Sequence, residues 1–148
     1  MYLDSAIIVK LLVREEDSAW FNRRLAGHEL WTSELALAEV RSAILIKERA
    51  KLVTAVERKA AFVQFESFCE AKSLRFRPLN LLVIERAAGL LVGCHPDVPL
   101  RSLDAIHLAT ALLHPHGPIC ATDGRLRAAA QRLGVACCPE DLDEIVKE

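Results

Sequence analysis

The sequence lacks the features of an exported, membrane-spanning or disulfide-stapled protein. It begins MYLD, with no basic segment, long apolar segment or cleavage site ahead of the fold. No apolar run reaches the roughly 18 residues that a membrane span requires. The five cysteines are odd in number and show no C-x-x-C spacing, so neither a disulfide framework nor a zinc knuckle is indicated. We therefore expect a cytoplasmic protein whose thiols fill the core.

Several common kinds of active site are also missing. There is no G-x-x-x-x-G-K or G-x-G-x-x-G element, so nucleotide binding of those kinds is not supported. Ser5 and Ser33 have no His/Asp relay in a suitable order, which argues against a serine hydrolase. His114 and His116 flank Pro115, and a solvent-facing loop explains them better than a two-histidine metal site.

The charge balance shows no basic surplus, because the formal net charge is −1. Nucleic-acid binders often carry such a surplus, so its absence argues mildly against a large, non-specific phosphate-binding surface. A site made of carboxylates would, however, mask a local basic rim in the total. The candidates for this rim, each of which could also be an ordinary solvated charge, are Arg23, Arg24, Arg41, Lys47, Arg49, Lys51, Arg75, Arg77 and Arg101.

What is present suffices for one globular domain, which we expect to span residues 1–148. The chain is 52% hydrophobic and 26% charged, the balance of a folded protein. A chain of this length buries about 70% of its unfolded surface. Short apolar strand candidates alternate with helical patterns, and the sequence has no internal repeats. This alternation predicts an α/β fold with a mostly parallel central sheet covered by helices on both faces.

The patterns predict short strands separated by amphipathic helices. Ser33 is a suitable N-cap for the third helix, and the proline-containing stretch 93–99 must be a loop. The helix expected at 54–71 has an unusually wide apolar face, so one side would pack inward and the other could meet a partner. The expected strands are 1–4, 30–32, 74–79, 119–122 and 135–137, and the expected helices are 5–13, 18–25, 33–50, 54–71, 81–92, 102–113 and 124–133.

Four acidic residues stand among neighbours that otherwise favour burial: Asp4, Glu39, Asp104 and Asp123. Asp4 and Asp123 each lie between a strand and a helix, where an aspartate commonly caps the helix. Asp104 falls in a first helical turn, where a carboxylate complements the helix dipole. Taken singly, these three have ordinary structural explanations.

Glu39 has no such explanation. It lies inside a helix and shares a face with apolar residues such as Ala43 and Ile46. Desolvating a glutamate there costs several kcal/mol unless it is paired, protonated or metal-bound. A salt bridge to Arg41 or Arg101 is the ordinary compensation, and a bound cation is the alternative.

The expected topology favours the cation. In parallel α/β sheets the ligand crevice lies beyond the carboxyl ends of the strands, where Asp4 and Asp123 are expected. If Glu39 and Asp104 project into the same crevice, four carboxylates meet there. Two charges 4 Å apart repel by about 4 kcal/mol at an effective dielectric constant near 20. An all-oxygen site of this kind suits Mg²⁺ or Mn²⁺ rather than zinc.

With these four acids in their sequence contexts, the chain resembles the PIN-domain ribonucleases, and among them the VapC-type toxins of toxin–antitoxin pairs. The resemblance rests on DSAIIVKLLVREED, AEVRSAI, LRSLDAIHLATALL and ATDGRLRAAAQRLGV, which stand in the family's order over nearly the full length. It implies a PIN-like three-layer α/β/α sandwich with a short-stranded central sheet. It also implies that the four acids are the catalytic, metal-binding residues and that the hydroxyls of Ser5 and Thr122 support them. Ala6 stands where many relatives have a second hydroxyl residue.

The resemblance further implies a function. The chain would hydrolyse RNA phosphodiester bonds with water activated by Mg²⁺ or Mn²⁺, and a basic rim would position the RNA backbone. It would be the toxin of a type II toxin–antitoxin pair, with a cognate small antitoxin protein as partner. The helical hairpin at 33–71 would serve homodimer formation and antitoxin binding.

Two other functions would use some of the same acids. A metal-dependent phosphatase would use Asp4 as nucleophile but needs a second aspartate two residues later, where Ala6 stands. A non-catalytic PIN-like module that only binds RNA or protein would have no need to keep all four acids. His107, close after Asp104, suggests a general base, but a metal-activated water needs none, so helix packing is the preferred interpretation.

Overall fold

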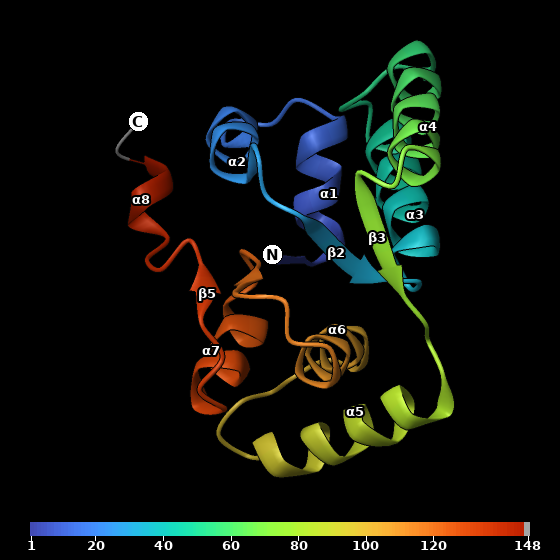
Figure 1. Cartoon of the computed structure of the whole chain (residues 1–148). Helices are drawn as coiled ribbons and strands as arrows, with labels where there is room; N and C mark the ends of the chain where they lie inside the picture. The colour runs from blue at the N-terminus through green and yellow to red at the C-terminus, as the bar shows by residue number, and fades with distance from the viewer. Residues whose placement is uncertain (147–148) are drawn as a thin grey trace.

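The computed structural model describes residues 1–146 and contains one central sheet (Figure 1). Its strands follow the order β3-β2-β1-β4-β5, and every neighbouring pair is parallel, so the predicted mostly parallel sheet is confirmed. The strands of the described residues are β1 (Tyr2–Leu3), β2 (Leu30–Ser33), β3 (Leu74–Arg77), β4 (Ile119–Cys120) and β5 (Cys137–Cys138).

Helices cover both faces of the sheet, which confirms the predicted three-layer sandwich (Figure 1). One core packs Leu3 and Phe21 with residues of α1, α3 and α4, and the other packs Tyr2 with α5, α6 and α7. Tyr2 and Leu3 face opposite layers because successive strand residues alternate. The helices are α1 (Ser5–Leu12), α2 (Ser18–Leu25), α3 (Ala36–Arg49), α4 (Ala55–Glu70), α5 (Leu81–Cys94), α6 (Ser102–Leu113), α7 (Gly124–Arg132) and α8 (Asp143–Val146).

The start of α3 differs from the prediction. The helix begins at Ala36, and Ser33 is the last residue of β2 rather than a helix N-cap. Ser33 pairs with Arg77 in the parallel ladder, which holds it extended. Its hydroxyl still accepts a hydrogen bond from the Leu35 N–H at 3.2 Å, inside the turn between strand and helix.

Two strands and one helix also differ from the prediction. β3 ends at Arg77 because Pro78, which follows, cannot donate to a ladder. The last strand lies at Cys137–Cys138 because Ile119 pairs with Cys137 and Cys120 with Cys138. The short helix α8 was not predicted.

Helix α4 has the predicted division between an inward and an outward apolar face. Phe65 and Ala61 are buried, whereas Val56 is 76% exposed and Val63 is 67% exposed. Thr54 and Glu57 begin the helix with a reciprocal capping box. Among residues 1–146 no helix is both long and apolar enough to cross a membrane.

Arg127 is a buried cation that joins the segments following two neighbouring strands, β4 and β5. Its guanidinium donates hydrogen bonds to the carbonyl oxygens of Ala121 at 3.1 Å, Pro139 at 2.8 Å and Glu140 at 3.0 Å. Ala121 directly follows β4, and Pro139 directly follows β5. The three carbonyls thus satisfy the buried guanidinium and fix the exits of both strands.

The sheet order determines where the candidate site lies. β1 and β4 are central neighbours, and the Asp4 N–H donates to the Cys120 carbonyl at 3.1 Å. Parallel strands end at the same edge of a sheet, so the segments after β1 and β4 emerge together. Asp4 and Asp123 belong to these two segments.

Candidate functional site

Asp4 follows β1 and caps α1. Its carboxylate accepts a hydrogen bond from the Ile7 N–H at 2.9 Å, and its side chain is buried. Burial raises the pKa of Asp4 to about 6; the Ile7 N–H and His107 oppose the rise, while the charges of Asp104 and Glu39 add to it. Asp4 is therefore both a helix cap and a carboxylate whose charge the protein only partly compensates.

Asp104 lies in the first turn of α6 and is half-buried. Burial, followed by the charge of Asp123, raises the pKa of this carboxyl, and His107, Arg101 and Arg125 oppose the rise. Among the described residues its Oδ2 atom is buried without a hydrogen-bond partner. A buried polar atom of this kind needs a partner from outside the chain, either water or a cation.

Asp123 caps α7 and is held ionised. Its Oδ1 accepts hydrogen bonds from the N–H groups of Arg125 at 2.8 Å and Leu126 at 3.1 Å. Burial works against ionisation, but these two bonds and the nearby guanidinium groups of Arg125 and Arg101 outweigh it, so the pKa of Asp123 is lowered. The Arg125 guanidinium lies 3.7 Å from Oδ2 of Asp123.

Glu39 is compensated by a histidine and a serine, not by an arginine. Its Oε2 accepts hydrogen bonds from Ser5 Oγ at 2.6 Å and from His107 Nε2 at 2.7 Å. Burial opposes ionisation, but these bonds outweigh it and lower the pKa of Glu39. The salt bridge to Arg41 considered from the sequence is not formed, because Arg41 lies 3.6 Å from Glu66 on α4.

His107 connects the site to the core. Its Nδ1 lies 2.9 Å from the Tyr2 hydroxyl, and its Nε2 also lies 3.1 Å from Ser5 Oγ. The side chain is only 3% exposed. Helix packing is thus an incomplete description of this residue, since both ring nitrogens are engaged. Its place three residues after Asp104, on the same helical face, was the available signal.

The structure brings the four predicted acids into one electrostatic network. Asp4 is influenced by Asp104 and Glu39, and Asp104 in turn by Asp123. All lie in segments that begin at the carboxyl edge of the sheet or pack against it. Of the two supporting hydroxyls, only that of Ser5 makes the expected kind of contact, because no hydrogen bond of the Thr122 hydroxyl occurs within residues 1–146.

Sequence reasoning missed Tyr2 and Arg125 as neighbours of this site, and of the nine candidates for a basic rim only Arg101 is placed near the acids, within the described residues, by its electrostatic influence on them. Arg101 and Arg125 lie close enough to influence the acids. By contrast, Arg75 pairs with Glu29, and Lys47 pairs with Glu15 far along α3. The two arginines near the acids lie at helix starts: Arg101 directly precedes α6, which carries Asp104, and Arg125 lies in the first turn of α7, which Asp123 caps.

The donor set suits a hard divalent cation in its chemistry. All four candidates offer carboxylate oxygens, the ligands that Mg²⁺ and Mn²⁺ prefer, and Asp104 Oδ2 has no partner among the described residues. Within the part of the chain that the structure describes, no three His, Cys, Asp or Glu side chains are grouped closely enough to hold an ion as they stand. Coordination of one ion by several of the acids would require their side chains to turn toward a common point.

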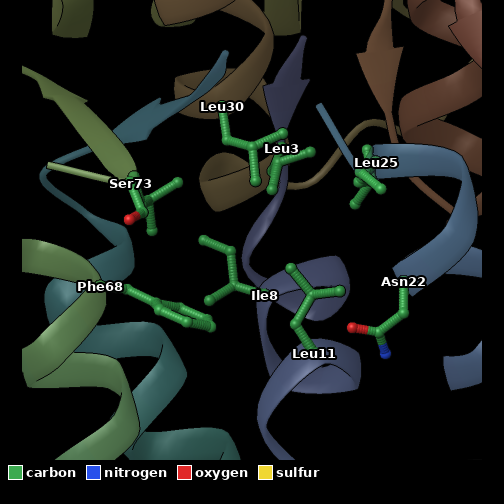
Figure 2. A pocket seen from close by; sticks show the side chains of 10 residues that line it. Leu3, Ile8, Leu11, Asn22, Leu25, Leu30, Phe68 and Ser73 are labelled. Atoms are coloured by element: carbon green, nitrogen blue, oxygen red, sulfur yellow. The ribbon is translucent and has the colours of Figure 1, made fainter. Parts of the chain in front are cut away.

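A second feature is an apolar cavity lined by residues of β1, α1, α2 and α4 (Figure 2). Its volume is about 170 Å³. Leu3 of β1, Ile8 and Leu11 of α1, Leu25 of α2 and Phe68 of α4 point into it (Figure 2). A cavity of about 150 Å³ accommodates a benzene ring, so this one matches a single apolar side chain or a small apolar molecule.

Comparisons with known proteins agree with this architecture. Ribonuclease VapC46 of Mycobacterium tuberculosis is 39% identical over 139 residues, covering 92% of this chain and 94% of that protein. Ribonuclease VapC45 of Mycobacterium tuberculosis is 33% identical over 147 residues, covering 97% of each. The crystal structure of FitAcB from Neisseria gonorrhoeae shares the fold, with a TM-score of 0.65 at 20% identity over 92% of this chain and 94% of that one. The family model described as PIN domain matches residues 1–131, and the chain belongs to the PIN domain family.

Proposed function

We propose that this protein is a Mg²⁺- or Mn²⁺-dependent endoribonuclease and the toxin of a type II toxin–antitoxin pair. Membership of the PIN domain family and the likeness to proteins named Ribonuclease VapC support the ribonuclease activity. The observation that carries the metal dependence is the buried Oδ2 of Asp104, which has no hydrogen-bond partner among residues 1–146 and lies in a network of further carboxylates.

The residues that would hold the ion are Asp4, Glu39, Asp104 and Asp123. A bound divalent cation would supply an activated water and neutralise negative charge on the phosphodiester. The chain prepares two of the four acids for this role, because hydrogen bonds keep Glu39 and Asp123 ionised. The other two, Asp4 and Asp104, keep raised pKa values and a corresponding need for positive charge.

Arg101 and Arg125 are suited to position the RNA backbone. Arg101 is exposed, Arg125 is partly buried, and both interact electrostatically with Asp104 and Asp123. Guanidinium groups bind phosphate oxygens through paired, charge-assisted hydrogen bonds. Two cations beside the acids would bring a phosphodiester next to the ion even though the net charge of the whole chain is close to zero.

The antitoxin would bind the apolar surface that α4 shares with α1 and α2. The cavity of Figure 2 could accept an apolar side chain of such a partner. One of its lining residues, Phe68, belongs to the predicted hairpin at 33–71. The exposed Val56 and Val63 lie on the same helix and are available for a homodimer contact.

The decisive experiment compares Asp104→Asn with the unaltered protein on a fluorogenic RNA in Mn²⁺. The variant should lose cleavage and keep its circular dichroism spectrum. Asp97→Asn is the matched control, because Asp97 is an exposed aspartate paired only with Arg132 in the described structure. Full cleavage by Asp104→Asn in nuclease-free preparations would overturn the proposal.

Two further assays separate the alternatives. Hydrolysis of a simple phosphomonoester without RNA cleavage would favour the phosphatase. Metal-independent RNA binding by a protein that never cleaves would favour the interaction module.

A further inference from the structure

We propose that His107, held by Tyr2, is a positioning residue that fixes the carboxylate of Glu39 for the divalent cation. This inference rests on the proposed function, since it assigns a role toward the same metal site. It concerns residues from three separate elements: Tyr2 lies on β1, Glu39 on α3 and His107 on α6. Their contact therefore depends on the whole fold.

The contacts form a continuous chain. The Tyr2 hydroxyl lies 2.9 Å from His107 Nδ1, and His107 Nε2 lies 2.7 Å from Glu39 Oε2. Tyr2 is fully buried, and its ring meets the imidazole edge-on with ring centres 5.9 Å apart. Glu39 is the least buried of the three, with 21% of its side chain exposed. The chain thus runs from the core outward and ends on a carboxylate at the site.

The direction of these hydrogen bonds follows from the chemistry of Tyr2 and Glu39, which lie at the two ends of this chain of contacts. A tyrosine hydroxyl ordinarily titrates at about pH 10, so the buried Tyr2 hydroxyl carries a proton that it can donate at neutral pH. If Tyr2 donates to Nδ1, a singly protonated imidazole carries its proton on Nε2 and donates it to Glu39. The opposite tautomer would set a nitrogen lone pair against a carboxylate oxygen at 2.7 Å, which is repulsive.

Two donors converge on one oxygen of Glu39. Ser5 Oγ and His107 Nε2 both donate to Oε2, so this oxygen is anchored at one point and neither bond occupies Oε1. A glutamate has three rotatable side-chain bonds, and ordering it on metal binding would otherwise cost free energy. Outer partners that orient a ligand in this way commonly change metal affinity by about 10- to 100-fold.

Simple packing does not account for the arrangement. An apolar side chain would fill the space in α6, but it would leave the Tyr2 hydroxyl without its histidine partner and Glu39 with one donor instead of two. A partly buried carboxylate that loses a donor is costly, and it also becomes free to change rotamer. A positioning role therefore predicts that a substitution of His107 that keeps its hydrogen-bond donor preserves metal affinity, whereas one that keeps only its bulk does not. A packing role predicts no such difference.

The test measures Mn²⁺ affinity without RNA, by titration calorimetry of the metal-free protein. His107→Leu should weaken Mn²⁺ binding by about 10- to 100-fold. His107→Gln should retain an affinity close to that of the unaltered protein, because its side-chain amide can donate from nearly the place of Nε2. Tyr2→Phe should give an intermediate loss, and His28→Gln, which alters an exposed histidine, should have no effect.

A second readout needs no metal. The imidazole ¹⁵N shifts of His107 in the metal-free protein should report the Nε2-protonated form, and Tyr2→Phe should shift the population toward the other tautomer. This measurement tests the hydrogen-bond chain even where His107→Leu folds poorly, since Tyr2→Phe and His107→Gln preserve size.

The outcomes separate this inference from the proposed function. Equal Mn²⁺ affinity in His107→Leu and the unaltered protein would overturn the positioning role and leave the metal site standing. Equal losses in His107→Gln and His107→Leu would reduce His107 to packing and would overturn it as well. If the unaltered protein binds no Mn²⁺, the proposed metal site fails, whatever tautomer His107 adopts.

Discussion

The two pairs of acids at the candidate site differ in how the protein treats their charge. Glu39 and Asp123 receive two hydrogen bonds each, and their pKa values are lowered. Asp4 is buried with a single backbone donor, Asp104 has a buried oxygen without any partner in the described structure, and both pKa values are raised. The protein stabilises one pair by itself and leaves the other pair dependent on added positive charge.

The difference teaches that carboxylates with similar local roles can be compensated to different degrees, and incomplete compensation is what the proposed cation site predicts. A structural carboxylate is normally satisfied by the chain, as Asp123 is at the start of α7. Asp4 caps a helix in the same way, yet burial raises its pKa to about 6. The same local role at two strand ends therefore hides different energetics, and substitutions should separate them.

The largest expected effect is on catalysis. Asp4→Asn should lower RNA cleavage by more than about 100-fold, because loss of even an outer partner of a metal ligand costs about 10- to 100-fold. Initial rates with a fluorogenic RNA in Mn²⁺ would measure it, with Glu85→Gln on the exposed face of α5 as the control. Cleavage by Asp4→Asn within a few-fold of the unaltered protein would remove Asp4 from the site.

The same substitution should have the opposite effect on stability. The pKa of Asp4 is about 6 in the folded protein and 3.8 ordinarily, so at pH 7 its ionisation costs about 3 kcal/mol of folding free energy. Asparagine caps a helix as well as aspartate does and cannot ionise. In chelator at pH 7, Asp4→Asn should therefore be more stable by up to about this amount.

The sign of the pH dependence is defined by the raised pKa. Because protonation of Asp4 favours the folded state, the advantage of Asp4→Asn should shrink as the pH falls through 6 and should nearly vanish near 4. Urea unfolding at several pH values would measure it. A variant that is less stable than the unaltered protein at pH 7 would show that Asp4 is compensated by the chain after all.

A divalent ion should remove the difference between the two pairs. At a concentration about 100 times its Kd, Mn²⁺ should raise the free energy of unfolding by about 2.7 kcal/mol. The rise should be much smaller in Asp104→Asn, and excess chelator should reverse it. An equal rise in that variant would place the ion elsewhere on the protein.

The smallest expected effect concerns Asp123. Asp123→Ala should lose about 1 kcal/mol of stability, because the N–H groups of Arg125 and Leu126 lose their acceptor. Asp123→Asn should cost less stability than Asp123→Ala while still reducing cleavage, since asparagine caps the helix but loses the charge that the lowered pKa shows to be favourable. A large stability loss in Asp123→Asn would mean that its charge, and not its cap, supports the fold.

Local signals explain what the sequence could predict. Asp4 and Asp123 were recognisable because a polar residue between an apolar strand and a helix is a local pattern, and the alternation of elements predicted the parallel sheet. The end of β2 was misplaced because Ser33 is held extended by Arg77, a ladder partner that lies 44 positions later and leaves no mark near Ser33.

Long-range pairing explains what the sequence could not predict. Glu39 was recognised as needing compensation, but its partner was sought among arginines. The partner is His107, 68 residues away, and the contact exists only when α3 and α6 meet beside β1. Periodicity identifies which face of a helix is buried, but it does not identify which polar side chain lies opposite.

The buried guanidinium of Arg127 bears on where this domain can be cut. The family match ends at residue 131, yet two of the three carbonyl acceptors of Arg127 belong to Pro139 and Glu140. A chain shortened to the matched region would lose an edge strand and leave a cation in the interior without most of its acceptors. The buried contacts of the fold therefore extend at least through Glu140, so truncations from the C-terminus should stop after that residue and not after residue 131.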